Sequence, residues 1–325
     1  MSAITITRLG AAAALTIDEA MDALQRLHDE YSIIPAHALD TTAQWLDIIR
    51  SSAHAAGATD VGDLLTESSS LISTAAGVKG VTAFHSDADS AKLHAARNTL
   101  AALAAAAYVN HRHDPSAAYR DLPLLKMRTN LPRRPLEDDE ILLCRIQALH
   151  LLRTGNPTER RNAAAYVAAD AGLPPTEATA LRTSDLHLDA PLLTMAPTRG
   201  FQARAIPLEP FHTATFALHL QRLESTLLAY APRKNTPGSD QAACSMHGVL
   251  GRFLKTLGIT GADLTAGSVY HWGIRRILDH HGLASALCAV GYADNQDDRL
   301  LKLIGTAAQV PQVTPTTAPE HHHGF

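Results

Sequence analysis

Positively charged side chains gather in a few short stretches of this sequence, and the chemistry open to them is phosphate binding. The densest stretch is 114–135, in which Asp114 and Asp121 are the only acidic residues. Its five cations are Arg120, Lys126, Arg128, Arg133 and Arg134. Each phosphate that such a cation neutralises adds salt-sensitive affinity for a nucleic acid. The stretch therefore predicts either a strap across a phosphate backbone or a solvated linker.

Three further pairs of cations lie on predicted helices and turns. Lys92 and Arg97 stand near the start of a predicted helix, and Arg275 and Arg276 stand within another. For these four residues, a solvated helix face is the alternative to phosphate binding. The third pair, Arg199 and Arg204, brackets a predicted turn between two short apolar runs.

The elements that must position these cations are mostly helical. Apolar residues recur at helical spacing, and capping residues and Gly mark the ends of most segments. The predicted helices are 16–31, 39–56, 61–75, 87–109, 137–153, 158–169, 176–181, 213–230, 246–257, 268–281 and 283–290, with Gly282 ending the next-to-last. Three short apolar runs split by turn residues predict strands at 186–188, 192–195 and 205–208. The expected fold is mainly α with one small three-stranded β-sheet.

Length and proline positions divide the chain. A chain of 325 residues is expected to form two domains. Four prolines within 114–135 resist helix formation there. We therefore expect a helical domain with an N-terminal arm at 1–113, a basic linker at 114–135, a second domain at 136–308 and a disordered tail at 309–325.

Composition excludes several classes of protein. The net charge of −4 counts against a polycationic nucleic-acid binder unless the cations are segregated. The three cysteines, Cys144, Cys244 and Cys288, lack metal-ligand spacing and are expected to be buried thiols of a cytoplasmic protein. No apolar run reaches the roughly 18 residues of a membrane span. We expect no cofactor, no metal and no membrane association.

The stretch 172–208 resembles the catalytic domain of the tyrosine recombinase (phage integrase) family. The family pattern is Gly-Leu-Arg-x-x-Glu-Leu, a later Leu and Asp, a hairpin carrying a Lys, and then Arg-x-Val-Pro-Leu. The matching positions are Gly172, Leu173, Glu177, Leu181, Asp185, Arg204, Pro207 and Leu208. Arg134-Pro135-Leu136, together with Glu140, resembles the motif at the start of the second domain in many family members. The resemblance implies a core-binding-like (SAM-like) helical domain followed by a recombinase catalytic-like domain, closing together around duplex DNA.

The positions that carry the family's chemistry depart from its pattern. Family members use a Tyr nucleophile, two Arg, a hairpin Lys and assisting His residues. By spacing, these roles fall on Pro174 and His271 (the two Arg), Arg199 (the Lys), Ser268 and Tyr292 (the His residues) and Leu301 (the nucleophile). An alternative alignment places the second Arg at Arg275, and a displaced nucleophile at Tyr270 or Tyr292 is a further alternative. The resemblance thus implies a recombinase fold without catalytic residues.

The sequence therefore predicts a DNA-binding protein that has lost recombinase catalysis, as a regulator or accessory factor of a mobile element. Its expected partners are double-stranded DNA and further copies of itself on DNA, with the segment after Gly291 as the contact. The predicted DNA-binding residues are Lys92, Arg97, Lys126, Arg128, Arg133, Arg134, Arg199, Arg204, Arg275 and Arg276. Two alternatives stay open: a protein-interaction scaffold that does not bind DNA, and an active recombinase with displaced catalytic residues.

Overall fold

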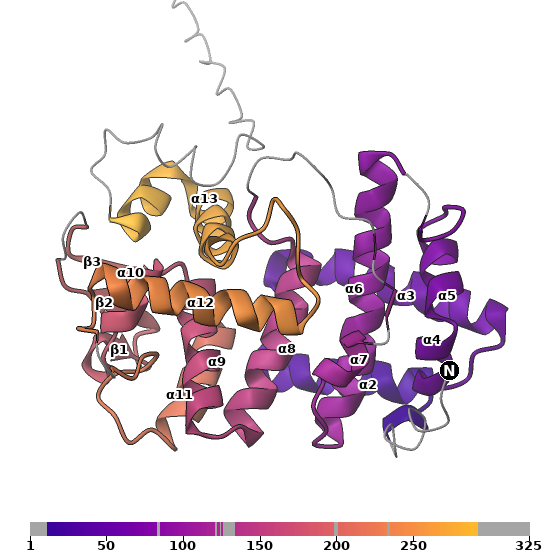
Figure 1. Ribbon diagram of the computed structural model, residues 1–325, viewed down its shortest axis with the longest axis horizontal. Coiled ribbons are helices and arrows are strands. Elements are labelled where there is room, and N and C mark those ends of the chain that lie inside the picture. The colour runs from indigo at the N-terminus through magenta and orange to yellow at the C-terminus, as the bar shows by residue number, and fades with distance from the viewer. Residues whose placement is uncertain are drawn as a thin grey trace, which may run out of the picture.

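Helices dominate the chain, as the sequence predicts. The computed structural model describes residues 12–82, 85–120, 122–123, 125, 134–197, 201–232 and 235–291. In the first part of the chain the helices are α2 Ile17–Tyr31, η1 Ala36–Ala38, α3 Leu39–Ala56, α4 Val61–Thr66, α5 Ser68–Ala75, α6 Asp87–Asn110 and α7 Ser116–Arg120. In the second part they are α8 Asp138–Thr154, α9 Pro157–Asp170, α10 Pro175–Ala180, η2 Thr183–Asp185, α11 Pro210–Leu220, α12 Asp240–Thr256 and α13 Gly267–Val290 (Figure 1).

The single sheet of the described residues sits at one end of the molecule (Figure 1). Its strands are β1 Leu186–His187, β2 Leu192–Met195 and β3 Arg204–Pro207, in the order β1-β2-β3 and all antiparallel. Leu193 lies opposite Leu186 on one side and Ile206 on the other, and all three face the core. Successive side chains of a strand alternate between faces, so short apolar runs are enough to bury one side of this sheet. The predicted fold class, mainly α with a small three-stranded sheet, is confirmed.

One predicted segment is wrong, and another contains a helix that the sequence did not predict. The helix expected at 213–230 ends at Leu220, because the chain turns and returns along the end of α10. The Leu228 amide donates to the Leu181 carbonyl, and a ring nitrogen of His219 bonds the Leu228 carbonyl. These long-range hydrogen bonds outweigh the helical spacing of the leucines. The short helix α7 lies inside the predicted linker, directly after Pro115, a position where proline's missing amide costs no helical hydrogen bond.

Smaller differences concern element ends and the cysteines. The predicted helix 61–75 is two helices, α4 and α5, that meet at Glu67. Helix α12 starts at Asp240 rather than near 246, because the Ser239 side chain accepts a hydrogen bond from the Ala242 amide. Cys144 is buried as expected, but the other two cysteines are exposed. The predicted tail at 309–325 lies outside the described residues, within which no helix is long and apolar enough to cross a membrane.

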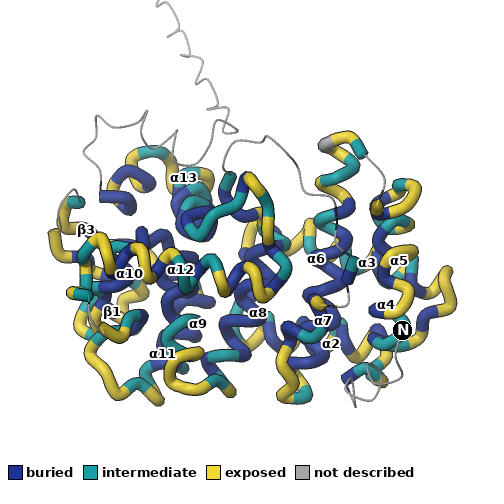
Figure 2. Tube along the Cα trace, in the orientation of Figure 1, coloured by how far each residue is buried: buried dark blue, intermediate teal, exposed yellow. Residues whose placement is uncertain are grey.

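Helix α6 joins the first part of the chain to the second. It packs against α2, α3 and α5 on the one hand and against α8 on the other. Its residues from Leu100 to Ala107 are all fully buried, and six of these eight are alanines (Figure 2). Small side chains bring helix axes close together. Buried residues from both parts of the chain consequently belong to one connected apolar core.

Helix α13 crosses the end of α9 at a pair of glycines. Its backbone kinks at Gly282, which has a φ of 79°, where the sequence predicts the break between two helices. Gly273 lies so close to the end of α9 that a Cβ placed on it would meet the Asp170 carbonyl oxygen and lie 2.8 Å from the Gly172 nitrogen. Backbone atoms cannot move aside as a side chain can.

Replacement of this glycine should separate the two helices. We expect Gly273→Ala to lower the free energy of unfolding by about 2–4 kcal/mol, because the added methyl group overpacks a backbone contact. Urea denaturation followed by circular dichroism measures the change. The matched control is Gly251→Ala in α12, where an added Cβ meets nothing within 4 Å. This control should be more stable than the unmodified protein by about 0.5–1 kcal/mol, and equal effects of the two substitutions would contradict the packing argument.

Candidate nucleic-acid interface

Six of the ten predicted DNA-binding residues lie in the described part of the chain. Lys126, Arg128, Arg133 and Arg199 lie outside it. Of the six, four have their side chains engaged within the protein: Arg97, Arg134, Arg204 and Arg276. The other two, Lys92 and Arg275, are partly exposed and make long ion pairs with carboxylates on their own helices. Surface pairs of this kind contribute little, so these two cations remain accessible to a phosphate.

Arg204, on β3, is bound to Glu177 on α10. The Nη1 atom of Arg204 donates to Oε1 of Glu177 at 2.8 Å, and its Nη2 pairs with Oε2. Its Nε donates to the Ala289 carbonyl oxygen near the end of α13 at 2.6 Å. Arg204 is 8% exposed and Glu177 is 1% exposed. This pair joins the sheet to two helices, and it holds the Arg204 guanidinium inside the protein.

Arg97 and Arg134 are likewise engaged, at the contact between α6 and α8. Arg97 is buried rather than solvated; its Nε donates to the Pro123 carbonyl at 3.0 Å. Arg134 makes two hydrogen bonds to Glu140, of 2.8 and 2.9 Å, and a third to Asp263 at 2.9 Å. Both arginines are held by acceptors of the protein itself.

These two arginines line a cavity of about 650 Å³ between α3, α6 and the start of α8. Carboxylates outnumber cations in its wall: Glu137, Asp138, Asp139, Glu140 and Asp263 line it as well. Asn98 of α6 donates to Asp139 at 2.7 Å. Burial and the neighbouring Glu140 charge raise the pKa of Asp139 to about 7. A phosphate group entering this cavity would meet more negative than positive charge.

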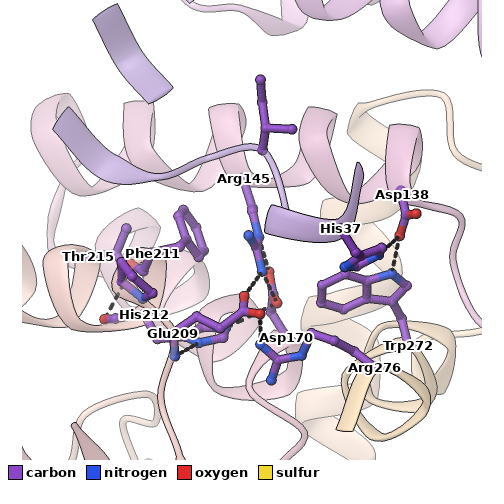
Figure 3. Close-up of polar contacts among 12 residues, drawn as sticks. His37, Asp138, Arg145, Asp170, Glu209, Phe211, His212, Thr215, Trp272 and Arg276 are labelled. Carbon is purple, nitrogen blue, oxygen red and sulfur yellow. Dashed lines mark hydrogen bonds and ion pairs between the residues drawn. The ribbon is translucent and has the colours of Figure 1, made fainter. Parts of the chain in front are cut away.

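A buried ion network lies under the start of α11 and joins α8, α9, α11 and α13 (Figure 3). Arg145 donates to both carboxylate oxygens of Asp170, each at 2.9 Å, and to Glu209 at 3.0 Å. Glu209 also pairs with Arg276, and Asp170 bonds a ring nitrogen of His212 at 3.1 Å. Arg145, Asp170 and His212 are at most 1% exposed.

The charged groups of this network compensate one another. Burial would raise the pKa of Asp170, but the Arg145 and His212 side chains outweigh it and hold that pKa far below its ordinary value. In the same way Arg145 and Arg276 overcome burial and lower the pKa of Glu209 to about 2. Burial lowers the pKa of His212, so its ring is neutral near pH 7. Two guanidinium groups thus balance two carboxylates.

Two arginines, a histidine and the nearby Trp272 are residue types that could stabilise a reacting phosphate. In this protein, however, both arginines already bind carboxylates, and a phosphate would have to displace them. The Trp272 indole donates to Asp138, which also bonds His37 at 3.0 Å (Figure 3). The network therefore has the chemistry of a structural ion cluster.

Sequence reasoning missed this network, although one signal for it was present. Arg145 lies four residues after Ile141 and four before Leu149, so it shares the buried face of a helix that those residues predict. A charge on a buried face requires a partner of opposite charge. The partners themselves come from three separate segments, and no spacing in the sequence connects them.

Two of the positions that the resemblance assigns to catalysis, Pro174 and Ser268, are occupied by buried residues at the starts of helices. Pro174 is buried immediately before α10. Ser268 is fully buried, and its hydroxyl accepts a hydrogen bond from the Thr265 amide at the start of α13. His271 is half-buried, while Tyr292 and Leu301 lie outside the described residues. Within the described ranges, no group of three or more His, Cys, Asp or Glu residues could hold a metal ion.

Comparison with known proteins gives matches among solved structures only. No family model and no curated protein matches the chain. The XerA recombinase matches with 17% identity and a TM-score of 0.41, over 62% of this chain and 70% of that one. A lambda integrase dimer bound to a core site matches with 15% identity and a TM-score of 0.40, over 95% of this chain and 83% of that one. The Tn1549 transposon integrase in complex with circular intermediate DNA matches with 13% identity and a TM-score of 0.37, over 90% and 96%.

These are proteins to which the chain is similar, each a recombinase or an integrase by name. Their TM-scores lie below 0.5, so the superposition is loose.

Removal of the central arginine of the network should strongly destabilise the protein. We expect Arg145→Met to cost about 3–5 kcal/mol of unfolding free energy, because it leaves the buried Asp170 carboxylate without its guanidinium. The matched control, Arg275→Met, removes a guanidinium from a partly exposed pair with Asp279 and should change stability by less than about 0.5 kcal/mol. Urea midpoints of the two variants measure the difference, and similar midpoints would contradict a structural role for the network.

The raised pKa of Asp139 should appear in the pH dependence of stability. Between about pH 4 and pH 7 the folded protein holds a proton on Asp139 that the unfolded chain has released. The contribution of this group to stability is therefore largest near about pH 4 and is lost as the pH rises to about 7.

Substitution by asparagine removes this titration. The melting temperature of Asp139→Asn, relative to the unmodified protein, should rise between about pH 5 and about pH 8. Asp40→Asn, at an exposed position of α3, controls for the substitution itself. A difference that stays constant with pH would show that Asp139 ionises normally.

Proposed function

We propose that this protein binds double-stranded DNA through a recombinase-like fold that no longer catalyses recombination. One observation carries the proposal: the residues of the 172–208 motif that build the scaffold are in place, and those that would carry catalysis are replaced. Glu177 and Arg204 form the buried pair that joins α10 to β3. The first catalytic position of the same motif is a buried proline, Pro174, which has no donor for a phosphate oxygen.

The charge of one sequence stretch and two partly exposed cations support the DNA-binding part of the proposal. The stretch 126–134 holds four cations and no carboxylate. Arg134 is fixed by internal ion pairs, and Lys126, Arg128 and Arg133 lie outside the described residues. Lys92 and Arg275 add partly exposed charge. We assign DNA contact first to Lys126, Arg128 and Arg133, and second to Lys92, Arg199 and Arg275. For Arg97, Arg134, Arg204 and Arg276 we propose structural roles.

The chemistry that the reaction needs supports the proposed loss of catalysis. A tyrosine nucleophile requires cations that stabilise charge on the phosphate it attacks. Pro174 supplies no charge, so neither His271 nor the alternative Arg275 completes a pair of permanent positive charges, and the arginines of the buried network are neutralised by Asp170 and Glu209. A regulatory or accessory role on a mobile element is a hypothesis that rests on the family resemblance alone.

A protein-interaction scaffold is the second candidate. It is supported by the net charge of −4 and by the internal pairing of most described candidate cations. The DNA measurement below separates the two functions.

Duplex DNA affinity across a salt series tests the proposal, with fragments that flank the protein's own gene. We expect binding that weakens steeply as salt rises from about 50 to about 200 mM. Replacing Lys126, Arg128 and Arg133 together by alanine should reduce the slope of log affinity against log salt concentration. The expected reduction is about 0.9 for each phosphate contact that is lost. Arg50→Ala, at a partly exposed position of α3, is the control and should leave affinity unchanged. Absence of binding at low salt would refute DNA binding and favour the scaffold.

A nicked DNA substrate that traps covalent intermediates tests the loss of catalysis. We expect no protein–DNA adduct with the unmodified protein. An adduct that disappears in Tyr292→Phe or Tyr270→Phe would instead establish an active recombinase with a displaced nucleophile.

A further inference from the structure

A second, smaller cavity lies where three helices end. It has a volume of about 280 Å³ and is lined by residues just before and after the ends of α6, α8 and α11. Its wall consists of Val109, Arg112, His150, Arg153, Thr154, Leu218 and Arg222. Three arginines and a histidine thus meet around a space large enough for a phosphate-sized group, and no carboxylate is among these lining residues.

This cavity is remote from the predicted DNA-binding residues Lys92 and Arg97 on α6. Asn98 of α6 contacts Asp139 near the start of α8, whereas Val109 and His150 share the cavity near the ends of both helices. The two helices therefore run side by side in the same direction (Figure 1). Lys92 lies in the second turn of α6 and Arg112 lies 20 residues later, which corresponds to about 30 Å along a helix.

His150 provides an observation independent of the arginines. It is 7% exposed, and its Nδ1 atom has no hydrogen-bond partner among the described residues. Its Nε2 lies 3.2 Å from the Thr154 hydroxyl, which donates its own proton to the His150 carbonyl at 2.8 Å. In the tautomer where the hydroxyl donates to the carbonyl and accepts from the ring, Nε2 carries the ring proton of the neutral imidazole. Nδ1 becomes a donor only when the ring takes up a second proton, as a bound anion would favour.

Arg112 provides a second observation. It has a φ of 59°, in the left-handed region that favours glycine. The His113 amide donates to the Tyr108 carbonyl and the Arg112 amide to the Val109 carbonyl, so α6 ends in a motif whose left-handed position is most often glycine. Arg112 thus places a guanidinium at the cavity from a backbone conformation that disfavours a side chain.

We infer that this cavity, enclosed by Arg112, Arg153, Arg222 and His150, binds a small phosphate- or sulfate-type dianion. Guanidinium groups bind such anions through paired, charge-assisted hydrogen bonds. The nearby carboxylates do not line the cavity; Asp114 accepts hydrogen bonds from Ser116, and Glu159 accepts one from the Asn156 amide. This inference does not depend on the proposed DNA binding.

A purely structural role for the arginines is the alternative. Helix C-termini carry partial negative charge, which favours cations nearby. Arg222 does donate to the Arg153 carbonyl at the end of α8, at 2.8 Å. If the arginines only stabilise helix ends, their removal should lower stability without affecting any anion.

Titration calorimetry of the full chain with sulfate, against chloride at equal ionic strength, tests the inference. Sulfate keeps its double charge near neutral pH, so any proton taken up belongs to the protein. Burial lowers the pKa of His150, while Asp114 and Glu159 act to raise it and Arg153 to lower it. Arg112 and Arg222 also face the cavity. We expect saturable binding with net proton uptake, measured as a heat that depends on the buffer.

Arg112→Gly is the decisive variant, because it removes a guanidinium from a backbone position that suits glycine. We expect sulfate affinity to fall at least about tenfold, with a melting temperature equal to or above that of the unmodified protein. The control is Arg50→Gln, which removes a remote guanidinium from α3 without placing a glycine in the helix. This variant should bind sulfate with unchanged affinity. Absence of saturable sulfate binding, or equal affinity in Arg112→Gly, would overturn the inference.

A DNA-binding measurement on the same variant tests whether the cavity binds a small anion or a phosphate of DNA. Arg112→Gly should bind duplex DNA with unchanged salt dependence. If this variant loses DNA affinity and the unmodified protein does not bind sulfate, the cavity is a DNA contact and the inference of a small-anion site fails.

Discussion

The buried bond between Arg145 and Asp170 is the interaction on which the second part of the fold depends. Ionised groups are tolerated away from water only when each is paired and hydrogen-bonded. This requirement fixes α8 against α9, and through Glu209 and His212 it fixes the start of α11. Arg276 extends the same network to α13, so one set of buried ion pairs links four helices.

A similar logic separates scaffold from function in the cations of this chain. The arginines most strongly marked by the recombinase resemblance and by the charge clusters, Arg204 and Arg134, are the ones held by internal carboxylates. A positive side chain in a sequence can serve a partner or the fold, and burial decides between them. In the described residues, the cations nearest the core stabilise it, and those on helix surfaces remain available.

Local signals in the sequence were sufficient for much of the fold. The sheet and the break at Gly282 were predicted because turn residues and glycine act within a few positions. The segment 221–230 was not, since hydrogen bonds to residues near Leu181 determine its path. For the candidate site, the sequence identified the cations but not their partners. Arg97 bonds the carbonyl of Pro123, 26 residues away, and such pairings arise only when the chain is folded.

The alanine face of α6 has a consequence for how the two parts of the chain move. Alanine has no side-chain rotamers, so the contact loses almost no side-chain entropy when it forms. It equally has no alternative side-chain conformations through which the contact could adjust when strained. The helices on either side of α6 should therefore move as one rigid body, and any closure around a ligand would have to arise in segments outside this contact.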